Sequence, residues 1–228
     1  MKALAAIFGR TLVVAPHADD EVLGAGGTIA RLSAAGGEVH VAVVTSGRPP
    51  RFSIELRNRV RKEAELAHAK LGVKDTVWLD LPAAQLTETP TADLNAALDK
   101  VMMDVAPTTL LLPFIGDMHV DHQLVFRSAM VAARPHSANY PERILAYETV
   151  SETNWNAPYL GPSFVPNMFV CIDDHLSLKI EAMRLYQSQL REPPHERSVE
   201  SLRALATVRG ATIHRAAAEA FVWIRCVT

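Results

Sequence analysis

Short apolar runs alternate with amphipathic segments in the first half of the sequence, and this alternation limits the possible fold more than any other feature. Apolar runs at residues 11–15, 39–45, 76–79 and 108–112 predict strands. The segments between them carry apolar residues at helical spacing. Parallel strands are buried on both faces and need crossover helices, so we expect an α/β fold: a mostly parallel sheet with helices on both faces.

The individual helices can be placed by their start and stop signals. Predicted helices of the first half cover residues 27–35, 53–71 and 91–105. The second half is less regular. It predicts helices at 124–133, 176–190, 201–208 and 212–220, and strands at 144–150 and 169–172. Residues 221–226 predict a terminal strand or the end of a helix.

Length and composition predict one domain over residues 1–228. Of the 228 residues, 49% are hydrophobic and 21% charged, which is ordinary for a globular protein. The net charge of −2 gives no electrostatic basis for binding nucleic acid or an anionic membrane. No segment has the roughly 20 apolar residues of a membrane helix. Cys171 and Cys226 lie outside any Cys-x-x-Cys pair, so a reducing cytoplasm is expected.

Residue types that bind metals follow the first predicted strand directly. His17, Asp19, Asp20 and Glu21 come within six positions of the end of that strand. His17 and Asp20 are spaced so that both can reach one cation from a single turn. We expect Glu21 to cap the following helix or to support the ligands rather than to bind the metal itself.

A second cluster follows the strand at 108–112. It contains two histidines and two aspartates within residues 117–122. Because the carboxyl ends of neighbouring parallel strands share one edge of a sheet, the two clusters can face each other across a crevice. His17, Asp20 and His122 would then form a site of nitrogen and oxygen ligands with one open position, as in catalytic zinc sites.

Together with the remaining residues of the two clusters, this site predicts an enzyme that hydrolyses amides with the help of a metal. One zinc ion per chain would acidify a bound water, although iron(II) or cobalt would also suit these ligands. The Asp19 side chain diverges from that of Asp20, so we expect Asp19 to take the proton of that water. His119, oriented by a hydrogen bond from its ring to Asp121, would stabilise the developing oxyanion and assist the leaving amine.

The stretch PHADDEVLGAGGTIARL, together with the later PFIGDMHVDH, resembles the LmbE-like, or PIG-L, zinc-dependent N-deacetylases. The family's two motifs usually read Pro-His-Pro-Asp-Asp-Glu and His-x-Asp-His. Weaker similarities extend over most of the chain, and the pair of motifs is the specific part. The resemblance implies a Rossmann-like fold. It also implies hydrolysis of an N-acetyl group, commonly on an N-acetylglucosamine unit, to a free amine and acetate.

The resemblance assigns the same roles when it is carried over by position. The family's zinc ligands match the three residues predicted above, and its general base matches Asp19. Its histidine that supports the intermediate matches His119, and the acidic partner of that histidine matches Asp121. Ala18 stands where proline is usual. This departure should loosen the turn without removing a function.

The resemblance also implies a substrate and a residue that contacts it. The substrate would be a small N-acetylated sugar or sugar conjugate, and a homo-oligomer is possible because relatives often assemble. The family's substrate-contacting arginine matches Arg61 or Arg57, which are four residues apart and share a helix face. We favour Arg61. The loops at 152–166 and 191–197 would shape the rest of the pocket.

Two other functions stay open. A metal-dependent hydrolase of another small amide would use the same site. A non-catalytic Rossmann-type protein would share the fold, and Gly24 and Gly26 begin like the dinucleotide motif G-x-G-x-x-G. Ile29 stands at the third glycine of that motif, so close helix packing explains these glycines better. His68 is expected to face solvent.

Overall fold

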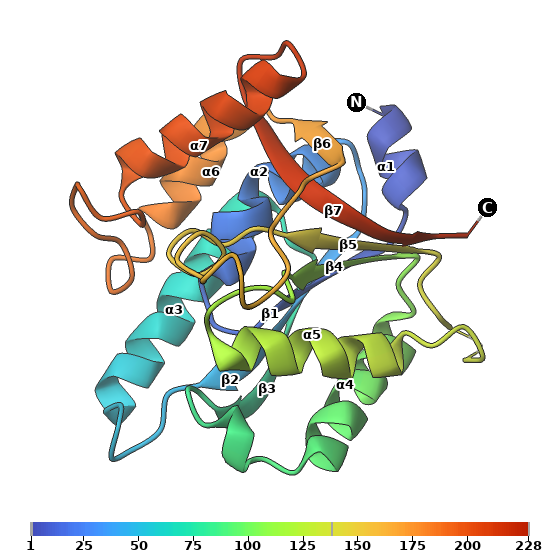
Figure 1. The fold of residues 1–228 in the computed structure, drawn as a ribbon, viewed down its shortest axis with the longest axis vertical. Helices are drawn as coiled ribbons and strands as arrows, with labels where there is room; N and C mark the ends of the chain where they lie inside the picture. The colour runs from blue at the N-terminus through green and yellow to red at the C-terminus, as the bar shows by residue number, and fades with distance from the viewer. Residues whose placement is uncertain (1, 138, 228) are drawn as a thin grey trace.

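A seven-stranded sheet with the order β3-β2-β1-β4-β5-β7-β6 runs through the centre of the molecule (Figure 1). The computed structural model describes residues 2–137 and 139–227. Its strands are β1 (Thr11–Ala15), β2 (Val39–Ser46), β3 (Asp75–Pro82), β4 (Thr109–Pro113), β5 (Arg143–Tyr147), β6 (Met168–Cys171) and β7 (Ala218–Cys226). Its helices are α1 (Lys2–Phe8), α2 (Asp20–Ala34), α3 (Ile54–Leu71), α4 (Thr91–Val105), α5 (Val120–Ala132), α6 (Leu176–Met183) and α7 (Val199–Thr212), with a 3-10 turn at Leu86–Glu88.

The first five strands run parallel to one another. β1 pairs with β2 on one side and with β4 on the other, while β2 pairs with β3 and β4 with β5. β7 is antiparallel to both of its neighbours, β5 and β6. The predicted α/β fold with a mostly parallel, Rossmann-like sheet is therefore confirmed.

Helices cover both faces of the sheet, as expected (Figure 1). Helices α4 and α5 pack on one face, over apolar side chains such as Leu12 and Val14 of β1. Helices α2, α3, α6 and α7 cover the other face, where Val13 of β1 lies. Since β1 has buried residues on both faces, its five residues read as one continuous apolar run.

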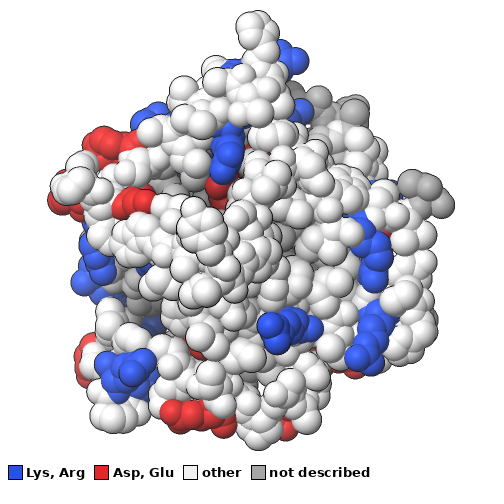
Figure 2. All heavy atoms as spheres, in the orientation of Figure 1, with Lys and Arg blue, Asp and Glu red and all other residues white. Residues whose placement is uncertain are grey.

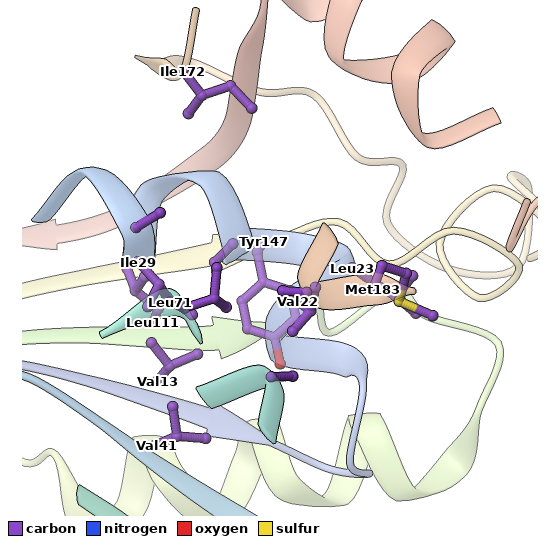
Figure 3. Packing of buried hydrophobic residues seen from close by; sticks show 14 of the residues in the cluster. Val13, Val22, Leu23, Ile29, Val41, Leu71, Leu111, Tyr147, Ile172 and Met183 are labelled. Atoms are coloured by element: carbon purple, nitrogen blue, oxygen red, sulfur yellow. The ribbon is translucent and has the colours of Figure 1, made fainter. Parts of the chain in front are cut away.

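Helix α2 packs very close to the sheet because of its glycines. In Figure 3 the ring of Tyr147 lies among the labelled side chains of the core, beside Val22 of α2. A Cβ added at Gly24 would lie 2.2 Å from the Tyr147 ring, and one at Gly27 would lie 2.7 Å from Ile172. The interpretation of these glycines as packing residues is confirmed.

The local signals placed most of the first half correctly. Ser53 caps α3 by accepting a hydrogen bond from the Leu56 amide, and Gly72 ends that helix in the left-handed conformation. Two predicted starts were too late, however. Helix α2 begins at Asp20 rather than at residue 27, and α5 begins at Val120 rather than at residue 124. Both helices thus begin inside the polar clusters.

Two of the helices predicted for the second half of the chain differ from the structure. Residues 212–220 do not form a helix: α7 ends at Thr212 and the alanine-rich stretch leads into β7. Pairing of residues 218–220 with β6 outweighs the helix propensity of alanine there. The predicted helix 176–190 ends at Met183 because the following residues form turns that bring Ser188 onto the Glu63 carboxylate.

The surface is mixed in charge. On the face shown in Figure 2, basic side chains stand in several separate places rather than in one patch. Within residues 2–137 and 139–227, no helix combines the length and the apolar character needed to cross a bilayer. Cys171 and Cys226 are free thiols in this structure. The cytoplasmic location stays a prediction.

Replacing Gly24 by Ala should destabilise the protein by about 1–3 kcal/mol, because the new methyl group would overlap the buried Tyr147 ring. Gly26→Ala is the matched control on the same helix. Its Cβ would first meet atoms at 3.2 Å, among them the flexible Lys179 side chain, so its loss should be smaller. Urea unfolding monitored by circular dichroism measures both. Equal stability of the two variants would contradict the packing argument.

Candidate metal and catalytic site

The two polar clusters meet at the carboxyl edge of the sheet. β1 and β4 are hydrogen-bonded neighbours in parallel register, so the segments that follow them leave the sheet side by side. His17 lies in the turn after β1, and Asp20 is the first residue of α2. His122 lies in the first turn of α5, which follows β4. The fold therefore brings together the three ligands expected from the sequence.

The donor atoms of these three residues form a nearly equilateral triangle. His17 Nδ1 lies 3.3 Å from Asp20 Oδ2, His122 Nε2 lies 3.2 Å from the same oxygen, and the two nitrogens are 3.3 Å apart. A tetrahedral ion with bonds of about 2.0–2.1 Å separates its ligand atoms by roughly 3.3 Å. The triangle therefore fits one face of a tetrahedral metal site and leaves the fourth position open.

Each histidine of the triangle is bonded to a carboxylate through its other nitrogen. His122 Nδ1 lies 2.8 Å from Asp117 Oδ2, and His17 Nε2 lies 3.1 Å from Asp121 Oδ2. Asp117 is itself held by the Thr153 hydroxyl at 2.6 Å. Metal-binding histidines commonly have such carboxylate partners, which fix the ring and its tautomer. The ring orientation needed for binding is thus present in the protein itself.

The electrostatics of this triangle favour a cation. Burial lowers the pKa of His122, but the Asp20 and Asp117 carboxylates outweigh it and raise the pKa to about 10. For His17, bonds to Asp121 and Asp20 likewise outweigh burial, and its pKa is raised to about 9. The carboxylates therefore stabilise positive charge between them, as a site for a divalent metal requires.

Asp19 lies beside the triangle but its carboxylate faces a different direction. It occupies the N-cap position of α2, yet its side chain makes no capping hydrogen bond in the described structure. The carboxylate instead lines the cleft next to the site and lies 3.3 Å from Arg197. Burial raises the pKa of Asp19 to about 7, although the Arg197 guanidinium acts in the opposite direction. A carboxylate of this kind can exchange a proton near neutral pH.

His119 lies on the same side of the cleft, with its ring centroid 4.5 Å from that of His17. Its Nδ1 accepts a hydrogen bond from the Asp121 backbone amide, so the bond expected from the ring to the Asp121 carboxylate is not the one formed. Burial and the positive neighbours His17 and His122 lower its pKa to about 4. His119 is therefore neutral, with its proton on Nε2, and is suited to donate to an oxyanion.

The cleft has a volume of about 230 Å³ and extends from His17 of the triangle toward α3. Arg57 and Arg61 both line it. Arg61 donates to both carboxylate oxygens of Asp80 at 2.9 Å and lies over the Trp78 ring, 4.4 Å from its centroid. Apolar side chains form much of the remaining wall on this side: Phe52, Leu56 and Val60.

Some residues of the site were not foreseen. Asp117 was in the second cluster, and its position five residues before His122 gave no reason to expect a bond to that ring. Arg197 and Glu152 come from the two loops predicted to shape the pocket, and they pair with each other at 3.1 Å. Ala18, the departure from the usual proline, is buried and lines the cleft.

Comparison with known protein families shows to which family the chain belongs. A family model described as "PIG-L: GlcNAc-PI de-N-acetylase" matches residues 12–133, which is more than half of the sequence and includes both polar clusters. The chain belongs to the PIG-L family. The resemblance stated from the two motifs is thereby confirmed.

Individual relatives of this PIG-L protein are deacetylases. An uncharacterized deacetylase, YaiS, of Escherichia coli (strain K12) is 28% identical over 78% of this chain and 90% of its own length. The diacetylchitobiose deacetylase of Thermococcus kodakarensis is 28% identical over 88% of this chain and 78% of its own. The structure of the N,N'-diacetylchitobiose deacetylase from Pyrococcus horikoshii superposes with a TM-score of 0.76 at 26% identity, covering 95% and 84% of the two chains. The protein is thus a deacetylase, a hydrolase of amide bonds.

Replacing Asp117 by Asn should weaken binding of a divalent metal by about 10- to 100-fold, because His122 would lose its charged partner. The matched control is Asp104→Asn, which removes an exposed carboxylate paired with Lys100 far from the clusters. Titration of metal-free protein with Zn²⁺, followed by calorimetry, measures the change. Equal affinity in the two variants would show that Asp117 does not support the ligand.

Proposed function

We propose that this PIG-L protein is a zinc-dependent N-deacetylase that removes the acetyl group from an N-acetylated sugar or sugar conjugate of the N-acetylglucosamine type. One observation carries the proposal: a triangle of two histidines and an aspartate beside a separate buried carboxylate, Asp19, in an open cleft. The triangle suits one zinc ion per chain. The relatives that act on diacetylchitobiose support a sugar substrate.

In this proposal His17, Asp20 and His122 hold the metal. When bound, zinc supplies Lewis acidity, which acidifies a water and polarises the substrate carbonyl. The protein's own groups then divide the remaining work. Asp19 takes a proton from the attacking water, because its carboxylate faces the cleft and its pKa is raised toward neutrality.

The neutral His119 ring stabilises the negative charge that develops on the carbonyl oxygen. Asp121 would support it through the backbone amide that donates to His119 Nδ1. The leaving amine needs a proton, and the lowered pKa of His119 makes its ring a poor source. Asp19, which has just accepted the proton of the water, is the better donor. The products are then a free amine and acetate.

The sugar would occupy the cleft toward α3. Arg61 is our candidate for a substrate contact because the Asp80 carboxylate and the Trp78 ring hold its guanidinium at the wall of the cleft. A sugar hydroxyl could bond to the guanidinium, and an aromatic ring suits the apolar face of a sugar. Arg57 lines the same wall and stays the alternative.

Two other functions are distinguished by direct assay. A hydrolase of another small amide would act on N-acyl amino acids and not on N-acetyl sugars, so a panel of both separates it from the proposal. A non-catalytic binding protein would show no turnover and no response to a chelator. Assembly into a homo-oligomer stays a prediction.

Replacing Asp19 by Asn should lower deacetylase activity by at least about 100-fold while leaving the zinc content unchanged, because the base is lost and the ligands are kept. Asp104→Asn, the exposed control, should keep both. Activity on N-acetylglucosamine or N,N'-diacetylchitobiose and elemental analysis are measured on the same samples. Lost zinc with unchanged turnover would refute the assigned role of Asp19.

Replacing Arg61 by Ala should raise the KM for an N-acetyl sugar by about tenfold, which corresponds to one lost hydrogen bond to a charged group. Arg57→Ala, on the same face of α3, is the matched comparison. Steady-state kinetics on purified zinc-loaded enzyme decide between the two residues. A larger rise in KM for Arg57→Ala would transfer the substrate contact to Arg57.

A further inference from the structure

The backbone of Asp19 has an unusual conformation with a direct effect on its side chain. Its φ is +124°, a region that residues with a side chain rarely adopt. Aspartate at the N-cap of a helix ordinarily turns its carboxylate onto the free amides of the first turn. Here the Asp19 carbonyl accepts from the Val22 and Leu23 amides, while the carboxylate lines the cleft. The unusual backbone therefore accompanies a carboxylate that does not cap the helix and instead lies 3.3 Å from Arg197.

A second carboxylate lies on the Asp19 backbone. Glu21 has no solvent exposure, and its Oε2 accepts a hydrogen bond from the Asp19 amide at 3.2 Å. Its other oxygen, Oε1, accepts a hydrogen bond from the Tyr186 hydroxyl at 2.6 Å. Burial raises the pKa of Tyr186 well above its ordinary value, so this hydroxyl keeps its proton and donates.

His68 of α3 also lies close to Glu21. His68 Nε2 lies 3.1 Å from Glu21 Oε1, close but outside hydrogen-bonding alignment. Its other nitrogen, Nδ1, lies 2.8 Å from the Thr76 hydroxyl of β3. His68 is buried, with 3% of its surface exposed. The expectation from the sequence that His68 faces solvent is wrong. Two residues distant in sequence, Tyr186 and His68, thus contact one oxygen of the Glu21 carboxylate, and its other oxygen accepts from the Asp19 amide.

We infer that Glu21 is a positioning residue for Asp19. Its carboxylate holds the Asp19 backbone in the conformation that directs the Asp19 carboxylate into the cleft rather than onto the start of α2. Tyr186 keeps Glu21 in place. This inference rests on the proposed role of Asp19 as the base, because the effect of Glu21 on the reaction passes through that residue.

The chain offers a matched buried carboxylate that does not reach Asp19. Glu219 of β7 is also buried and also bonds to α2, where it accepts hydrogen bonds from the Gly27 and Thr28 amides. It pairs with the buried Lys179 at 2.6 Å. Loss of either carboxylate should lower stability. Only the loss of Glu21 should change the reaction beyond that.

The test compares Glu21→Gln, Tyr186→Phe and Glu219→Gln with the wild type, all zinc-loaded and corrected for the folded fraction. We expect kcat to fall by about tenfold or more in Glu21→Gln and by a smaller factor in Tyr186→Phe, with KM and zinc content unchanged. In Glu219→Gln the melting temperature falls and kcat stays within about twofold. A kcat for Glu21→Gln equal to that of Glu219→Gln, or loss of zinc from Glu21→Gln, would overturn the inference.

A second measurement does not depend on activity. The Asp19 amide proton, bonded to a carboxylate, should resonate downfield in the ¹⁵N-labelled metal-free protein and move upfield in Glu21→Gln and Tyr186→Phe, but not in Glu219→Gln. An unmoved resonance would show that Glu21 does not hold this backbone. If the wild type deacetylates no substrate while the resonance moves, the proposed function fails and the contact stands. If Glu21→Gln does not fold, Tyr186→Phe carries both measurements.

Discussion

The parallel pairing of β1 with β4 is the constraint on which the whole site depends. Because both strands end at the same edge, the short turns after them release their polar residues into one space. Helices α2 and α5 begin within these turns, so Asp20 and His122 are held by the first turns of two helices that pack on opposite faces of the sheet. Two of the three candidate ligands are thus placed by regular secondary structure.

At this edge of the sheet, histidines are paired with buried carboxylates. Asp117 and Asp121 lie next to the triangle of His17, Asp20 and His122. They orient the two histidine rings and strengthen the preference for a cation. His119 and Asp19 both line the cleft, and their pKa values shift in opposite directions: that of His119 is lowered and that of Asp19 is raised. The acids and imidazoles at this edge thus differ in their partners and in the direction of their pKa shifts.

The strands, the two clusters and the three triangle residues could be predicted from the sequence. They depend on local pattern and on the rule that neighbouring parallel strands end at the same edge of a sheet. The contacts of Arg197 and Tyr186 and the burial of His68 could not be predicted, because each depends on residues that are far apart in the sequence. The sequence also predicted a helix at residues 212–220, where alanine favours a helix locally but residues 218–220 pair with β6. Local propensity is weakest where pairing partners are distant.

The position of β7 has a consequence for how the molecule assembles. β7 follows both of its neighbours in sequence but lies between them in space, and β6 at the edge pairs with β7 alone in the described sheet. The five parallel strands that carry the two clusters can therefore form before β7 is present. β6 and the Lys179–Glu219 pair cannot. The bonds of Glu219 to Lys179 and to the Gly27 and Thr28 amides of α2 thus require this last strand, whereas the pairing of β1 with β4 does not.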